Sequence, residues 1–104
     1  MTKQKLQEEL TAAMKARDEV RKSTLRMLLS GINYYEIEKG GAGYSATEED
    51  VLAVVQKEAK NRRDSITEYG KANRQDLVDK ETAELKILQT FLPEQMGEEE
   101  VKTI

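Results

Sequence analysis

Two clusters of basic side chains are the residues of this sequence best suited to binding chemistry. One is Lys60-Asn61-Arg62-Arg63, and the other surrounds Arg74. Guanidinium and ammonium groups within one helical turn are good donors to phosphate oxygens, and a helix start adds outward-pointing backbone N–H groups. Aromatic residues do not alternate with these cations, so sequence-specific readout of single strands is not expected. The candidate nucleic-acid contacts are Lys57, Lys60, Arg62, Arg63, Lys71 and Arg74.

Structural ion pairs are the alternative role of the same cations. Residues 57–74 contain six basic and three acidic side chains, whereas residues 76–100 contain two basic and eight acidic ones. If these segments form two antiparallel helices, their opposite charges meet across the interface. The structural ion-pair candidates are Arg62, Arg74, Asp76, Glu81 and Glu84. The residues alone leave both roles open.

The composition excludes several classes of enzyme site. The chain has 104 residues and a net charge of −3, and it contains neither cysteine nor histidine. Disulfides, thiolate or imidazole zinc sites and Ser-His-Asp triads are therefore excluded. No glycine-rich phosphate loop follows a strand, and no nucleophile lies near the paired carboxylates Glu81 and Glu84. We expect no catalytic residue, no metal site and no cofactor.

The elements that must position these cations are predicted to be helices, because the sequence is rich in helix-favouring residues and has one proline. Apolar residues recur at helical spacing over residues 2–17, where Thr2 is a suitable N-cap. After a break at residues 17–19, a second apolar stripe includes Val20, Thr24, Met27, Leu28, Ile32 and Tyr35. The glycine cluster at residues 40–45 predicts a mobile loop.

Two further helices are predicted to carry the charged segments. Thr47 and Asp50 match a capping box at the start of the third helix, whose apolar stripe also includes Arg62. Gly70 is predicted to end this helix, and Asn73 is predicted to cap a fourth that runs to Pro93. The chain then begins a possible fifth helix near residue 96. The sequence therefore predicts an all-α fold of about four helices plus the start of a fifth.

Several motifs in their order resemble the GatB/YqeY family across essentially the whole chain. They are Thr24-Leu25-Arg26-Met27-Leu28, Lys60-x-Arg62-Arg63-Asp64-Ser65-Ile66, Asn73-Arg74-x-Asp76-Leu77, Glu81-x-x-Glu84-Leu85-x-Ile87-Leu88 and Phe91-Leu92-Pro93-Glu94-Gln95. The resemblance implies a multihelical YqeY-like protein. It would comprise an N-terminal helical subdomain at residues 1–95, followed at residues 96–104 by a linker and the start of a truncated C-terminal tail.

The resemblance also implies a function linked to tRNA. The family is related to the C-terminal region of the GatB component of the glutamine-dependent tRNA amidotransferase, where the tail contacts tRNA and the catalytic centres lie elsewhere. Its carbon–nitrogen ligase label has no catalytic site to match in this chain. We therefore expect a non-catalytic helical module with tRNA and amidotransferase or other translation-linked subunits as partners. The alternative is a protein-interaction module without RNA contacts of its own.

The location follows from the apolar segments. The longest uncharged apolar stretch, residues 27–35, is too short to span a bilayer, and the N-terminus has no apolar signal segment. We expect a cytoplasmic protein with no membrane partner.

Overall fold

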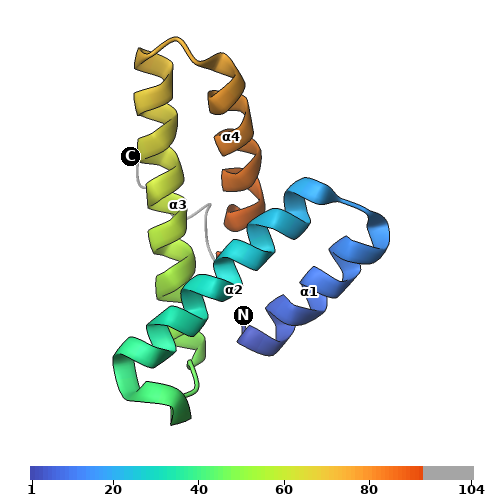
Figure 1. Cartoon of the computed structure of the whole chain (residues 1–104), viewed down its shortest axis with the longest axis vertical. Helices are drawn as coiled ribbons and strands as arrows, with labels where there is room; N and C mark the ends of the chain where they lie inside the picture. Colours follow the sequence, from blue (N-terminus) through green and yellow to red (C-terminus); the bar gives the residue numbers. More distant parts are fainter. Residues whose placement is uncertain (93–104) are drawn as a thin grey trace, which may run out of the picture.

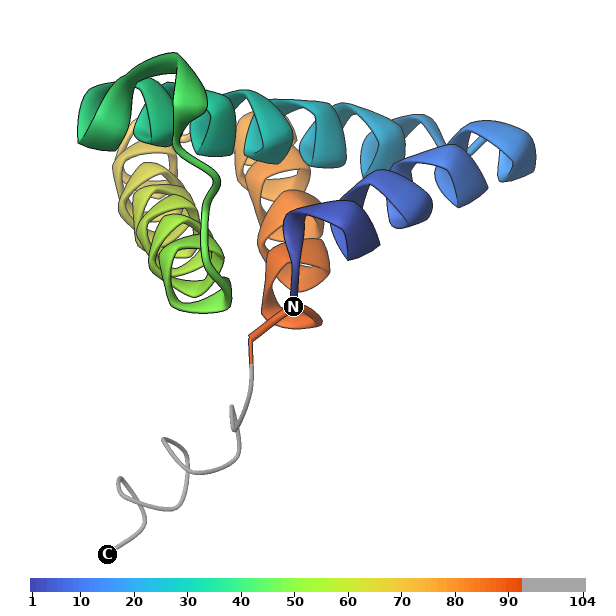
Figure 2. The same cartoon turned by 90° about the horizontal axis from the view of Figure 1, so that it is seen from below.

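The structure, a computed structural model, describes residues 1–92, and over that range it confirms the all-α prediction. Figure 1 shows two antiparallel helical hairpins, one made of α1 (Lys3–Ala16) and α2 (Glu19–Gly40), the other of α3 (Glu48–Lys71) and α4 (Gln75–Gln89). In Figure 2 the second hairpin is seen nearly end-on against one side of α2. The long helix α2 therefore crosses both helices of the α3–α4 hairpin.

The first hairpin turns within two residues. Thr2 caps α1 as predicted, since its Oγ1 accepts the Lys5 N–H at 3.0 Å, and Asp18 caps α2 by accepting the Arg21 N–H at 3.1 Å. Between these helices Arg17 has a left-handed backbone with φ of 58°. The N–H groups of Arg17 and Asp18 donate to the last carbonyls of α1, so the turn closes with its polar backbone groups satisfied.

The glycine cluster forms regular hydrogen-bonded structure where a mobile loop was predicted. Helix α2 continues through Gly40, and residues Gly41–Gly43 form a 3-10 turn, η1. Gly41 has φ of 81°, and a Cβ on Gly40 would lie 2.8 Å from the Cβ of Tyr44. Glycine at these two positions therefore allows the chain to turn sharply with the Tyr44 ring folded against it.

The second hairpin begins as predicted and turns differently. The capping box is confirmed: Thr47 Oγ1 accepts the Asp50 N–H at 3.1 Å, and Asp50 Oδ2 accepts the Thr47 N–H at 3.0 Å. The predictions for Gly70 and Asn73 were wrong, because α3 continues to Lys71 and Asn73 itself takes the left-handed conformation, with φ of 60°. Asparagine tolerates this conformation, so the turn did not need the glycine.

The core lies where α2 crosses the other helices. Its buried side chains come from all four helices and from Phe91 just beyond α4: Leu6, Ala13, Leu25, Leu28, Leu29, Ile32, Val51, Val54, Val55, Ala59, Leu88 and Phe91. Helices α2 and α3 contribute four of these side chains each, more than α1 or α4. Val20 and Met27 were predicted on its inner face, yet 46% and 38% of their surface remains exposed.

Two predictions concern the C-terminal segment. The predicted domain boundary at residues 95 and 96 and the predicted start of a fifth helix lie outside the described residues. Among the helices of residues 1–92, none is long and apolar enough to cross a membrane.

Candidate functional site

Arg62 is the one candidate contact that the fold buries. It lies on the inner face of α3 with 8% of its surface exposed. Its Nε is 2.9 Å from Glu84 Oε1 on α4, and its Nη1 is 3.2 Å from Glu58 Oε1 one turn earlier on α3. Glu81 lies slightly farther away, at 3.5 Å. The Arg62 guanidinium therefore joins the two helices of the hairpin and is turned away from any surface ligand.

The remaining donors and acceptors of this network are also satisfied. The Arg62 Nη2 donates to Met27 Sδ on α2, and Lys80 Nζ lies 3.2 Å from Glu84 Oε2. Both oxygens of Glu84, which is 3% exposed, are thus paired with a cation. A buried carboxylate needs this pairing, because an uncompensated charge in the interior is strongly destabilising.

Arg74 lies at the surface and pairs differently. Its guanidinium reaches Asp76, in the first turn of α4, through Nε at 3.3 Å and Nη2 at 3.2 Å. This hydrogen bonding holds the pKa of Asp76 below its ordinary value of 3.8. Arg74 makes no ion pair with Glu81 or Glu84, so its partner is local and it adds nothing to the cross-hairpin network.

Four of the candidate contacts gather on the outer face of α3. Lys57, Lys60, Arg63 and Lys71 are all exposed. Arg63 follows Arg62 by about 100° around the helix, which is enough to move it from the inner face to the outside. Within residues 1–92 none of the four pairs with another helix; Lys60 meets Asp64 on α3 at 3.0 Å. We call these four side chains the α3 basic face.

The sequence prediction missed several partners that the structure brings together. Glu58 and Met27 contact Arg62, and Lys80 contacts Glu84. The spacing of four residues between Glu58 and Arg62, and between Lys80 and Glu84, is the signal that could have identified two of these contacts. Met27 lies on the predicted apolar stripe of α2, but nothing in the sequence pairs it with Arg62.

A second polar cluster surrounds Asp50 and was also missed. The hydroxyl of Tyr44 donates a very short hydrogen bond to Asp50, and the hydroxyl of Tyr35 donates at 3.0 Å. Together with the Thr47 N–H, these donors hold the pKa of Asp50 well below its usual range, while the carboxylate raises the pKa of Tyr44 to about 12. The cluster fastens the connection after α2 to the first turn of α3.

Glu36 reinforces this connection from α2. Its Oε2 accepts the Ala46 N–H at 2.8 Å, and its Oε1 lies 2.9 Å from Lys3 Nζ on α1. These donors, the Ala46 N–H first, lower the pKa of Glu36. Across residues 1–92, no three acidic side chains converge as ligands for a metal ion. The polar clusters described so far therefore hold helices and turns in place.

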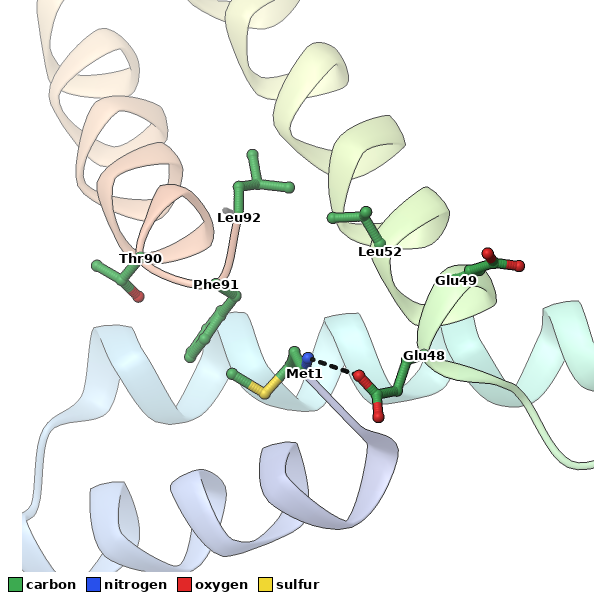
Figure 3. A pocket seen from close by; sticks show the side chains of 7 residues that line it. All are labelled: Met1, Glu48, Glu49, Leu52, Thr90, Phe91 and Leu92. Atoms are coloured by element: carbon green, nitrogen blue, oxygen red, sulfur yellow. Dashed lines mark ion pairs between the residues drawn. The ribbon is translucent and has the colours of Figure 1, made fainter. Parts of the chain in front are cut away.

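An apolar pocket of about 490 Å³ lies near the chain's N-terminus (Figure 3). Leu52 of α3 and Phe91 and Leu92 beyond α4 line it, with Met1 between them. The terminal amine of Met1 is 3.7 Å from Glu48 Oε1, so the N-terminus is paired at the rim of the pocket.

A comparison with known protein families shows which family the chain is related to. The profile described as "Yqey-like protein" matches residues 3–104. The chain belongs to this family. The match covers both the buried Arg62 network and the α3 basic face, so the features described above belong to a YqeY-like helical domain.

Three fungal relatives show how far the similarity extends. The protein named "Altered inheritance of mitochondria protein 41, mitochondrial" is 39% identical over 87 residues in Vanderwaltozyma polyspora, covering 84% of this chain and 46% of the relative. Its Kluyveromyces lactis namesake is 43% identical over 98 residues, covering 90% and 51%. An uncharacterized Schizosaccharomyces pombe protein is 36% identical over 89 residues, covering 86% and 70%.

These relatives bear on size and location. The chain spans about half the length of the two relatives named as mitochondrial. Their names place those two fungal proteins in mitochondria, and the cytoplasmic location of this chain stays a prediction.

Proposed function

We propose that this YqeY-like chain is a non-catalytic helical module that contacts the phosphate backbone of RNA, with tRNA as the expected partner, through the α3 basic face. The observation that carries the proposal is the division of the candidate cations. Arg62 is used internally, whereas Lys57, Lys60, Arg63 and Lys71 have no partner on another helix within residues 1–92.

The chemistry of this face suits phosphate groups. Its four cations lie on one side of a long helix, so they can approach successive phosphates of one strand or groove. Phosphate contacts position a protein on RNA without reading its sequence, which fits the lack of aromatic side chains among them. The overall charge of −3 restricts such binding to this face.

The resemblance to the amidotransferase component supports a tRNA- or translation-linked role with amidotransferase or other translation-linked proteins as further partners. The resemblance implies that the catalytic centres lie in other parts of the amidotransferase, so we expect no glutamine-dependent amidation from this chain alone.

Fluorescence anisotropy with labelled bulk tRNA tests the proposal. We expect saturable binding near 50 mM salt and a loss of roughly two decades of affinity near 200 mM, because about four phosphate contacts release counterions. Replacing Lys57, Lys60, Arg63 and Lys71 together by glutamine should abolish this binding.

A matched control separates the face from the overall charge. The control replaces Lys5, Lys15, Arg26 and Lys86 by glutamine, which removes the same three lysines and one arginine from exposed positions on other helices. Its affinity should fall much less. Equal losses in both variants, or no binding at low salt, would refute the proposal and favour the alternative, a protein-interaction module without RNA contacts.

A further inference from the structure

A groove of about 480 Å³ separates the start of α2 from α4, away from the α3 basic face. Glu19 and Val20 line it from α2, and Asp79 and Ala83 line it from α4. Val20 is 46% exposed although it continues the apolar stripe of α2. The groove thus has an apolar floor, formed by Val20 and Ala83, that no part of residues 1–92 covers.

Acidic side chains outnumber basic ones among the residues that line the groove. Glu19, Asp76, Asp79 and Glu84 line it, against one basic side chain, Lys80. Lys80 is drawn toward the inner wall by its ion pair with Glu84. Glu19 and Asp76 have neighbouring cations of their own, Lys22 at 3.1 Å and Arg74 at 3.2 Å.

Asp79 differs from the other wall carboxylates. It is exposed, and among residues 1–92 no cation lies within ion-pair distance of it. Its Oδ1 accepts a hydrogen bond from the Gln75 amide at 2.8 Å, which fixes the carboxylate beside the groove. An incoming ammonium or guanidinium group can pair with Asp79 without displacing an existing ion pair.

We propose that this groove docks a basic segment of a partner protein. A lysine or arginine of that segment would lay its aliphatic stem over Val20 and Ala83 and place its charged head against Asp79. The α4 side of the groove extends from residue 76 to residue 84, about 12 Å, which is enough for two turns of a partner helix. RNA does not fit this groove, because its phosphates would face the same carboxylates.

The probe for this proposal is a fluorescein-labelled, alanine-based helical peptide of 14 residues with lysine at every fourth position and two leucines. Its counterpart has glutamate in place of each lysine. We expect the lysine peptide to bind saturably and more weakly as salt rises, with the amide shifts of the ¹⁵N-labelled chain concentrated around Val20, Asp79 and Ala83. The glutamate peptide should not bind.

Two double variants separate this groove from the general surface. In V20S/D79N the apolar floor and the free carboxylate are both removed, and we expect affinity to fall at least about tenfold, equivalent to about 1.4 kcal/mol. The matched control I37S/E8Q changes an exposed β-branched residue of α2 and an exposed carboxylate of α1, and it should bind the peptide like the unmodified chain.

Other outcomes would overturn the proposal. Equal losses in both variants, absence of saturable binding, or amide shifts around Leu52 and Phe91 would show that the basic peptide does not use this groove. Sedimentation over a range of concentrations tests another occupant: self-association that V20S/D79N abolishes would assign the groove to a second copy of the chain. The RNA proposal is tested independently, because its variants leave the residues of the groove unchanged.

Discussion

The two ends of the α3–α4 hairpin are stabilised by different kinds of contact. At the open end, where α2 crosses, α3 and α4 contribute fully buried apolar side chains such as Val51, Val55 and Leu88. From Arg63 to Ala83, the part that includes the turn, no residue is buried, and Ile66, Tyr69, Leu77 and Val78 remain half-buried. The Arg62–Glu84 network lies at the boundary between these regions.

The comparison shows that a charged network can mark where an apolar core ends. The crossing is stabilised mainly by buried apolar side chains, whereas the outer half of the hairpin depends on one buried ion-pair network and partly exposed apolar contacts. Substitutions should therefore affect the two regions by different mechanisms, and their effects on the free energy of unfolding can be ranked.

The largest effect is expected at the crossing. Leu28, 1% exposed, packs in the centre of the core, so Leu28→Ala should lower the free energy of unfolding by about 4 kcal/mol through lost burial and the cavity left behind. Urea denaturation followed by circular dichroism measures this loss. Ile37→Ala, at a position on α2 that is 63% exposed, should change stability little; a comparable loss there would contradict the placement of the core.

The ion-pair network should give the next largest effect. Arg62→Met leaves Glu84 buried with Lys80 as its remaining partner, so we expect a loss of about 3 kcal/mol, at the lower end for a broken buried pair. The double variant Arg62→Met/Glu84→Leu should recover most of that stability, because no unpaired charge is then buried. If the double variant were less stable than the single one, the network would be contributing more than charge compensation.

The Asp50 cluster should stabilise the fold within a defined pH window. Because the pKa of Asp50 is lowered, its carboxylate stabilises the fold above pH 3.8, the ordinary pKa of this group. This stabilisation disappears as the pH falls further. Because the pKa of Tyr44 is raised to about 12, the contribution is complete below pH 10 and disappears as the pH rises through 12.

Tyr44→Phe tests this window, since it removes the hydroxyl and leaves the ring. In thermal melts at pH 7 the melting temperature of wild type should exceed that of the variant, by less than it exceeds that of Arg62→Met. The difference should disappear at both extremes of pH. Tyr34→Phe, on the exposed side of α2, serves as the control. A gap that is independent of pH would rule out the Asp50 hydrogen bond as its source.

The smallest expected effect is a gain in stability. Thr24 is 1% exposed on α2, and its Oγ1 has no hydrogen-bond partner within the described residues. Thr24→Val replaces this hydroxyl by a methyl group of similar shape, so we expect a gain of about 0.5–1 kcal/mol. Thr24→Ser keeps the hydroxyl and loses the methyl group, and urea denaturation should find it less stable than wild type.

The sequence predicted most of the helices because apolar periodicity and local capping are recorded in neighbouring residues. Thr2 and the Thr47–Asp50 capping box act within one helical turn, so their roles could be inferred directly. The end of α3 was misplaced because both Gly70 and Asn73 can terminate a helix, and the choice depends on how α4 packs. Val20 was misplaced because a groove separates it from α4.

The candidate site was predictable to a similar extent. Arg62 lies on the apolar stripe of its helix, which indicated an inward direction, and Arg63 must then point elsewhere. The Tyr44–Asp50 hydrogen bond had no periodic signal, because it joins the turn after α2 to the first turn of α3. Whether the α3 basic face binds RNA stays a prediction, since the fold places the cations without specifying their ligand.

The exposed turn between α3 and α4 is a place where residues can be inserted. All residues from Lys71 to Asp76 are exposed, and the nearest buried side chain on either side is Arg62 or Glu84. A short peptide tag inserted in this turn should leave the four-helix crossing intact. The same turn therefore offers an attachment point for fluorophores or surface immobilisation, at the end of the second hairpin that points away from α1 (Figure 1).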